Sequence, residues 1–99
     1  MTQPSLVLLV RFKSRLSLEE VEKVIASRID EFRALKGLQQ KYYLQDSSTG
    51  EIAGLYLWES NEDFLTYRES ELRRSIAEAY QAEGEPRIEV YGVLKSLRD

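Results

Sequence analysis

Residues 38–59 decide the fold, and their sequence is LQQKYYLQDSSTGEIAGLYLWE. Over 38–46 the side chains alternate with a period of two, which is typical of a strand near a sheet edge with one wetter face. One face of this strand is predicted to carry Leu38, Gln40, Tyr42 and Leu44, and the other Gln39, Lys41, Tyr43 and Gln45. Residues 47–50 (SSTG) have the composition of a turn and lead directly into a second strand at 51–59. The segment therefore predicts an antiparallel hairpin.

Gly54 lies inside the second arm of this hairpin. A glycine within a strand weakens the strand locally, and it usually marks a bulge or a place where another group packs close to the backbone. We expect one of these two features here.

A strand and a helix are predicted before the hairpin. Residues 5–13 (SLVLLVRFK) are rich in Leu and Val, which indicates a strand that is buried on both faces and therefore central. Ser17 and Glu20 have the spacing of a capping box, so a helix begins here. Apolar residues then recur every three or four positions, and Lys36 followed by Gly37 predicts that the helix ends at about Lys36.

A second helix and a last strand follow the hairpin. Residues 60–63 (SNED) repeat the helix-start signature, with acidic side chains where the helix dipole favours them. The helix is predicted over 61–81, and because charged residues interrupt its apolar stripe midway, we expect either a kink or two shorter helices. Gly84 and Pro86 end the helix, and residues 87–94 (RIEVYGVL) form the last strand.

The predicted element order is βαββαβ, within a single domain that spans residues 1–99. Each βαβ half crosses over right-handedly, so both helices lie on the same face of one sheet. The predicted fold class is therefore α+β, a ferredoxin-like sandwich of two helices on an antiparallel sheet. The other sheet face carries apolar and aromatic side chains that no part of the chain is left to cover, and such a face implies a partner. We expect a homodimer that pairs sheet against sheet.

The composition argues against several classes of function. The net charge is −3 and the pI is near 5.1, so nucleic acid is not an expected partner. The sequence contains neither Cys nor His, so disulfides, serine triads and the usual zinc, copper or iron sites are not expected, and we predict no metal and no cofactor. Its five glycines form no phosphate-binding loop. The apolar run 6–10 is too short for a signal peptide or a membrane span, so we expect a cytoplasmic protein without membrane contact.

Tyrosine is the conspicuous residue type, with six in the chain. Tyr56 and Trp58 lie two positions apart on one arm of the hairpin, and Tyr42 lies on the other arm. Such side chains can line a pocket for a flat organic ligand, or they can fill the core and the dimer interface. Tyr67 and Arg73 lie on the helix that covers the sheet, where either can donate a hydrogen bond to a ligand oxygen or remain a surface side chain. The residues alone leave both interpretations open.

The run Gly54-Leu55-Tyr56-Leu57-Trp58-Glu59-Ser60, followed by Glu62-Asp63-Phe64 and Tyr67, resembles the strand-to-helix segment of the dimeric α/β-barrel superfamily. The similarity is to monooxygenases of the YdhR type and to the antibiotic-biosynthesis monooxygenases. It implies two sheets paired into a barrel, and oxygenation of polycyclic aromatic substrates by O₂ without metal or flavin, with the deprotonated substrate supplying the electrons.

The resemblance also implies roles for individual residues. Trp58 would line the pocket and Tyr67 would be a catalytic donor, while Tyr56, Tyr42 and Arg73 are substrate-binding candidates on strand and helix geometry alone. Haem-degrading relatives use a helix histidine as iron ligand, and because this chain has no histidine, that chemistry is not expected.

The leading hypothesis is a homodimeric, cofactor-independent monooxygenase that acts on a small aromatic or quinone-like molecule. The alternative is a non-catalytic, ligand-binding or stress-responsive dimer of the same fold. A third hypothesis is an isomerase that resembles the muconolactone isomerases, in which only a proton moves. Oxygen dependence separates the first from the third, and turnover separates both from the second.

Overall fold

The computed structural model describes residues 3–98. The elements follow one another as β1 (Leu6–Ser14), α1 (Leu18–Arg33), β2 (Leu38–Gln45), β3 (Ile52–Trp58), α2 (Asn61–Arg68), α3 (Glu71–Arg74), α4 (Ile76–Ala79) and β4 (Ala82–Gly92). The strands form one antiparallel sheet in the order β2-β3-β1-β4, so β1 and β3 are central and β2 is at an edge. These positions confirm the predicted hairpin, the central first strand and the edge strand.

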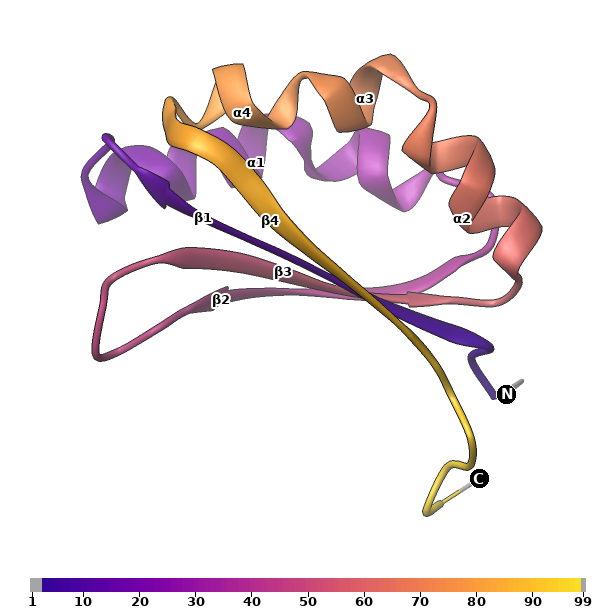
Figure 1. The fold of residues 1–99 in the computed structure, drawn as a ribbon. Coiled ribbons are helices and arrows are strands. Elements are labelled where there is room, and N and C mark those ends of the chain that lie inside the picture. Colours follow the sequence, from indigo (N-terminus) through magenta and orange to yellow (C-terminus); the bar gives the residue numbers. More distant parts are fainter. Residues whose placement is uncertain (1–2, 99) are drawn as a thin grey trace.

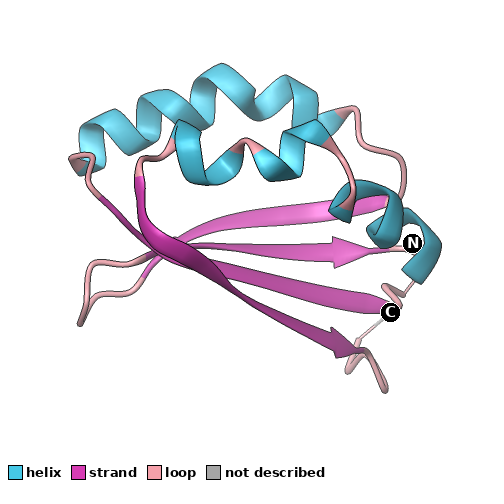
Figure 2. Cartoon of the chain, turned by 45° about the horizontal axis from the view of Figure 1, so that its top comes forward, coloured by secondary structure: helices cyan, strands magenta, loops and turns pink. Residues whose placement is uncertain are grey.

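The helices all lie on one face of the sheet, as Figures 1 and 2 show. The short helices α2, α3 and α4 together take the place of the second helix of the βαββαβ order. The α+β ferredoxin-like fold is therefore confirmed. Within residues 3–98, no helix is long and apolar enough to cross a membrane.

Helix α1 begins with the predicted capping box. The Ser17 hydroxyl accepts a hydrogen bond from the backbone N–H of Glu20, and the Glu20 carboxylate accepts one from the backbone N–H of Ser17. The helix ends at Arg33, so the predicted end at about Lys36 is wrong. Residues 34–36, which were predicted to be the end of the helix, lie in the turn into β2 instead. Gly37 in this turn has a φ of +80° and lies so close to Asp63 that a Cβ would collide with the carboxylate. The turn therefore packs against the start of α2.

The second helical region is broken more often than predicted. Helix α2 ends at Arg68, and the Ser70 hydroxyl accepts a hydrogen bond from the backbone N–H of Arg73 at 3.2 Å, so Ser70 caps the next helix, α3. Ser75 then follows α3 and precedes α4. Shorter helices were one of the two expected outcomes, but there are three pieces rather than two.

Strand β4 begins at Ala82, earlier than the predicted start at residue 87. Gly84 and Pro86 were predicted to end the preceding helix, but both lie within this strand. An edge strand tolerates a proline because one side of its backbone needs no partner. The pairing of β4 with β1 also shifts register beside these residues, as expected where a bulge interrupts the ladder.

Strand β2 contains a bulge that the alternation did not predict. Its pairing with β3 shifts between Leu38 and Gln40. One extra residue moves the following side chains to the other face, so Leu38 shares the helix-covered face with Lys41 and Tyr43. The prediction that Leu38 and Tyr42 share a face is therefore wrong.

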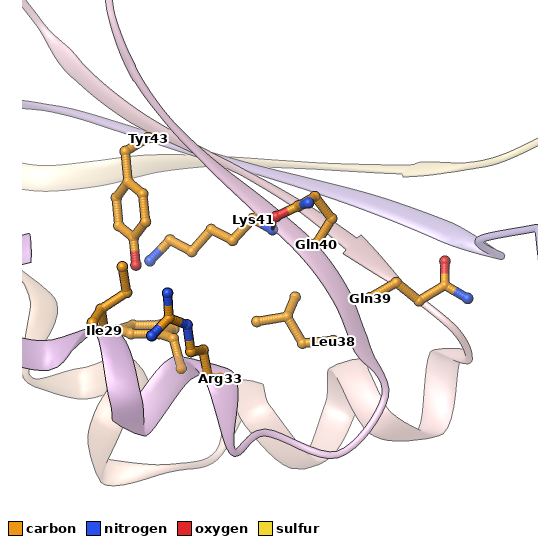
Figure 3. Close-up of a pocket in the computed structure, with 8 residues that line it drawn as sticks. Ile29, Arg33, Leu38, Gln39, Gln40, Lys41 and Tyr43 are labelled. Atoms are coloured by element: carbon orange, nitrogen blue, oxygen red, sulfur yellow. Dashed lines mark hydrogen bonds between the residues drawn. The ribbon is translucent and has the colours of Figure 1, made fainter. Parts of the chain in front are cut away.

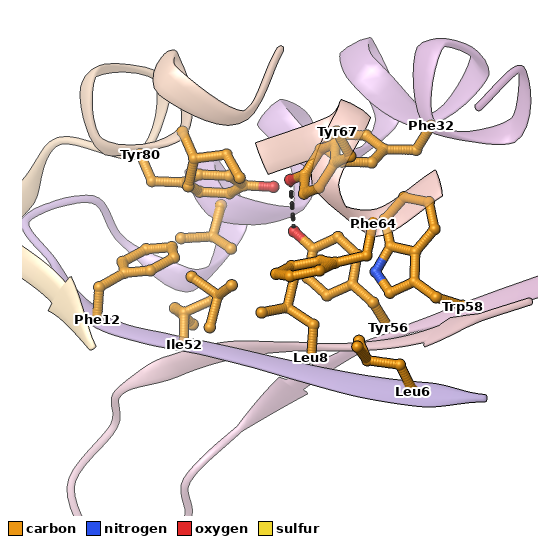
Figure 4. Close-up of a cluster of buried hydrophobic side chains, with 13 residues drawn as sticks. Leu6, Leu8, Phe12, Phe32, Ile52, Tyr56, Trp58, Phe64, Tyr67 and Tyr80 are labelled. Carbon is orange, nitrogen blue, oxygen red and sulfur yellow. Dashed lines mark hydrogen bonds between the residues drawn. The ribbon is translucent and has the colours of Figure 1, made fainter. Parts of the chain in front are cut away.

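The core between helices and sheet is mainly aromatic (Figure 4). Its largest fully buried side chains are Trp58, Tyr56 and Tyr67. The rings of Tyr56 and Trp58 lie nearly parallel, 5° apart in plane and 6.4 Å apart between centroids. Phe32 and Phe64 pack against these rings at tilted or edge-on angles. Such offset and edge-on contacts stabilise beyond the burial of area alone.

The face of the sheet away from the helices, hereafter the open face, is apolar. Its residues include Val7, Leu9, Tyr42, Leu44, Leu55, Leu57 and Tyr91. In β1, side chains alternate between buried and half-buried, so the expectation of a strand buried on both faces is not met within one chain.

Candidate functional site

A cavity of about 460 Å³ lies between α2, α3 and the strands β1 and β4, and we call it the helix-side cavity. Its volume falls within the roughly 300–1,000 Å³ of small-molecule sites. Its apolar walls are Leu8, Val10, Phe64, Leu65, Ile88 and Val90. Its polar groups come from Asn61, Tyr67, Arg68, Glu69 and Arg73. An apolar cavity with a few donors along one wall suits a flat organic ligand with oxygen substituents.

Tyr67 lines this cavity, as do Asn61 and Arg68 of α2. Its hydroxyl lies 3.1 Å from the hydroxyl of Tyr56, and either can be the donor (Figure 4). Burial raises the pKa of Tyr67 to about 12 and raises the pKa of Tyr56 well above the usual value of 10. Both phenols therefore keep their protons at neutral pH. Two O–H groups share one mutual hydrogen bond, so one O–H remains for another acceptor.

Arg73 is half-buried on α3 and also lines the cavity. Within residues 3–98, its guanidinium has no carboxylate at ion-pair distance. The neighbouring Arg74 differs, because it is exposed and contacts Glu71 at 3.0 Å. The Arg73 guanidinium is thus available to a negatively charged oxygen of a ligand.

Glu69 is the carboxylate that lines the cavity, and its side chain is 72% exposed and 3.4 Å from the Arg68 guanidinium. In the part of the chain that the structure describes, no three acidic side chains gather closely enough to hold a metal ion. The donors of the cavity are therefore a hydroxyl, an amide and guanidinium groups.

Trp58 and Tyr56 are core residues and do not line the helix-side cavity. Their rings support Tyr67 from below, with centroids 5.3 Å and 5.5 Å from its ring. Trp58 also backs a second hollow of about 300 Å³ on the other side of α2, lined in addition by Leu35 and Thr66. A direct contact between Trp58 and a ligand would need this second hollow.

Tyr42 lines neither the helix-side cavity nor the second hollow beside Trp58. It lies on the open face of β2, opposite Leu55, and its side chain is half exposed. The structure thus groups Tyr67 with Arg73, places Tyr56 and Trp58 behind them, and separates Tyr42 from all four.

Sequence reasoning did not propose several polar residues that line cavities, and two of them are Asn61 and Lys41. Asn61 lines the helix-side cavity, and its signal is its position as the first residue of α2, directly after a central strand. Lys41 lines a different cavity beside α1. Its signal is that it alternates with Tyr43 on one face of β2, although the sequence does not say which face the helices cover.

The fold and the cavity define a small ferredoxin-like α+β domain with a cavity on its helix side, and solved structures share this fold. SnoaB, a cofactor-independent oxygenase from Streptomyces nogalater solved as an Asn-to-Ala variant, is 14% identical with a TM-score of 0.76, covering 97% of this chain and 99% of that chain. A protein of unknown function from Nitrosomonas europaea is 15% identical with a TM-score of 0.77, covering 97% and 95%.

A provisionally assigned antibiotic biosynthesis monooxygenase from Caulobacter crescentus is 16% identical with a TM-score of 0.75, covering 94% of this chain and 92% of that chain. Neither the protein-family models nor the curated protein sequences contain a match. At these identities the likeness shows the fold, which is the one that the resemblance of residues 54–67 implied.

Proposed function

We propose that the protein is a homodimeric, cofactor-independent monooxygenase that oxidises a small aromatic or quinone-like molecule in the helix-side cavity. The observation that carries this proposal is that Tyr67 and Arg73 both line one cavity whose other walls are mainly apolar. The fold shared with SnoaB, whose name describes a cofactor-independent oxygenase, supports the same class of chemistry.

In this proposal the cavity stabilises the ionised form of the substrate. The half-buried Arg73 guanidinium binds the enolate or phenolate oxygen, since no carboxylate within residues 3–98 lies at ion-pair distance from it. The free O–H of the Tyr56–Tyr67 pair donates to the same oxygen. Donors fixed before the reaction stabilise developing charge most strongly where water is excluded, and a substrate bound against the apolar walls would displace water from these donors.

The chemistry needs only substrate and O₂. An anthrone-type substrate loses a proton to give an enolate, and its electron-rich carbon forms a C–O bond with O₂. The resulting peroxide loses water, so the methylene carbon becomes a carbonyl, one oxygen atom enters the product and the other leaves as water. The substrate supplies all the electrons that reduce O₂.

The homodimer is supported by the open face. Leu9, Leu55 and Leu57 lie half-buried at its centre, while Tyr42 and Tyr91 are half exposed beside them. An apolar face of this kind is costly in water and is covered most simply by a second copy, sheet against sheet.

Charged side chains surround this apolar centre. Arg11 donates hydrogen bonds to Asp46 at 2.5 Å and to Glu51 at 2.8 Å, and Glu89 accepts one from the Tyr91 hydroxyl. A face with charges of both signs can pair with its own copy after a twofold rotation, because each charge can then meet its opposite.

The test is oxygen consumption by the purified protein with a panel of anthrone- and hydroquinone-type compounds, in the presence of a chelator. We expect consumption above the rate of autoxidation, with a fall of at least about tenfold for both Tyr67→Phe and Arg73→Met. Arg74→Met is the matched control, since this neighbouring arginine is exposed and does not line the cavity.

Three outcomes would contradict the proposal. Thermal stabilisation by a panel compound without oxygen consumption would indicate a binding protein. Turnover that continues without O₂ would indicate an isomerase. Equal loss of activity in Arg74→Met would mean that the helix-side cavity is not the site.

A further inference from the structure

Another cavity, of about 270 Å³, lies between α1 and β2 and is lined by the Lys41 side chain (Figure 3). It is at the opposite edge of the sheet from β4. Its lining residues include Ile29, Phe32 and Arg33 from α1 and Leu38 and Tyr43 from β2. It shares no lining residue with the helix-side cavity. A site here is therefore independent of the proposed oxygenase chemistry.

The Lys41 amine lies among aromatic rings. Its Nζ is 3.5 Å from the ring centroid of Phe32, 4.4 Å from that of Tyr43 and 4.5 Å from that of Tyr56. Gly54, on the neighbouring strand, leaves the space that this side chain uses, since a Cβ there would lie 3.2 Å from Lys41 Cε. The close approach expected at Gly54 is thus the packing of Lys41 and Tyr56.

The charges around Lys41 disfavour its ammonium form. Arg28 and Arg33 face this region from α1, Tyr43 from β2 and Tyr56 from β3, so the nearby groups are cationic or neutral. Within residues 3–98 no carboxylate forms an ion pair with Nζ. The ring faces attract a cation, but burial and the Arg28 charge act against it. Burial dominates and lowers the pKa of Lys41 to about 7.

The other lysines have different surroundings. Lys13 and Lys23 are 68% and 76% exposed and lie within ion-pair distance of Glu83 and Glu19. Lys36 and Lys95 are also exposed. Lys41 is thus a half-buried amine beside an open cavity, with no carboxylate at ion-pair distance within residues 3–98.

We propose that Lys41 Nζ is a nucleophile that binds a planar aldehyde with an acidic substituent as an imine in the cavity beside α1. The apolar walls, Phe32 and Leu38, suit the planar body of such a ligand. Arg33 at the cavity wall, which also contacts the exposed Asp30 at 3.5 Å, suits its carboxylate. An amine freed of its proton by burial is the form that attacks a carbonyl.

The reaction is balanced without an oxidant or a reductant. The Nζ lone pair forms a bond with the carbonyl carbon, and a proton moves from nitrogen to the former carbonyl oxygen. Loss of water from this carbinolamine then leaves a C=N bond in place of C=O. Hydrolysis reverses the binding.

The probe is 4-carboxybenzaldehyde at limiting concentration and pH 7.5, with cyanoborohydride to reduce any imine to a stable amine, followed by proteolysis and mass spectrometry. We expect labelling of Lys41 to exceed that of each of Lys13, Lys23, Lys36 and Lys95 by at least about tenfold, since lysines with an ordinary pKa of about 10.4 are almost wholly protonated at this pH. Digestion separates the Lys41 peptide from the α-amino group, which also reacts near neutral pH.

The pH profile gives a second measurement on the unmodified protein. Lys41 labelling should reach half its maximum near pH 7, whereas labelling of the exposed lysines should still rise above pH 9. Gly54→Ala should reduce labelling of Lys41, because the added Cβ would lie 3.2 Å from Lys41 Cε.

Uniform labelling of all the lysines, or no adduct at Lys41, would overturn the proposal. Because this primary test uses the natural sequence, it does not depend on how a Lys41 variant folds. A protein that labels at Lys41 but consumes no oxygen would retain this site and lose the proposed oxygenase function, so the two proposals can fail separately.

Discussion

The two faces of the sheet are built from alternate residues of the same strands, yet they serve different contacts. On the covered face, Tyr56 and Trp58 are almost wholly inaccessible to water. On the open face, their neighbours Leu55 and Leu57 are half-buried within one chain. The covered face therefore holds the single chain together, while the open face remains available for association with another copy.

The largest effect expected from this difference is at Trp58. Trp58→Ala should lower the free energy of unfolding by about 3–5 kcal/mol, because the cavity left in the core is only partly refilled. Urea unfolding at low protein concentration measures this, with Leu57→Ala on the other face as the matched control. A similar loss for both variants would remove the distinction between the faces. Unaltered ligand binding in a strongly destabilised Trp58→Ala protein would refute a pocket role for Trp58.

A charge on the open face should act on association instead. Leu55→Asp should weaken dimerisation by about a hundredfold or more, because the carboxylate would be buried without a partner between two sheets. Sedimentation velocity over a concentration series measures this, and circular dichroism should show an unchanged fold. A variant that stays dimeric would place the interface elsewhere.

Stability should rise with pH because Lys41 lies on the covered face. Its pKa is about 7 in the folded chain against an ordinary 10.5, so the unfolded chain binds more protons between these values. The free energy of unfolding should therefore increase from about pH 7 towards pH 10, by up to about 1.4 kcal/mol per pH unit. Urea unfolding between pH 6 and pH 10 measures this.

Lys41→Met should remove this rise, whereas Lys36→Met, at an exposed position, should keep it. At higher pH the sign reverses. Unfolded tyrosines ionise near pH 10, while burial raises the pKa of Tyr67 and Tyr80 to about 12, so stability should fall as the pH passes 10. A rise that persists in Lys41→Met would show that another group causes it.

The smallest effect should come from the buried hydroxyl pair. Tyr67→Phe removes one partner of the 3.1 Å contact and leaves the Tyr56 hydroxyl unpaired, at a cost of about 1–2 kcal/mol. The double variant Tyr56→Phe, Tyr67→Phe should recover part of this loss, since neither hydroxyl then remains. A double-mutant cycle by urea unfolding measures the coupling, and fully additive losses would contradict a direct hydrogen bond.

Local signals explain what the sequence predicted well. The capping residues and the apolar periods act over a few positions, so the order of strands and helices followed from them. The bulge in β2 did not, because one extra residue changes the pairing of Leu38 without changing the composition. The early start of β4 was also missed, because Gly84 and Pro86 usually end an element and only the edge position lets them lie within one.

The candidate site was predictable in part. Tyr67 and Arg73 were named because they lie on the chain segment that covers the sheet, and both line the helix-side cavity. Tyr56 and Trp58 were harder to assign, since aromatic side chains suit a core and a pocket equally. The surroundings of Lys41 depend on Arg28 and Gly54, which are distant in sequence, so no local pattern indicates its lowered pKa.

The division of one helix into α2, α3 and α4 has a consequence for cooperativity. A four-residue helix closes too few hydrogen bonds to persist by itself, so α3 and α4 depend on their contacts with the rest of the domain. One such contact is Arg28 of α1, whose guanidinium donates hydrogen bonds to the Leu72 carbonyl at 3.2 Å and to the Ser75 hydroxyl at 2.8 Å. We therefore expect the part of the chain that presents Arg73 to the cavity to unfold locally at a lower free energy than the sheet, which amide hydrogen exchange would measure.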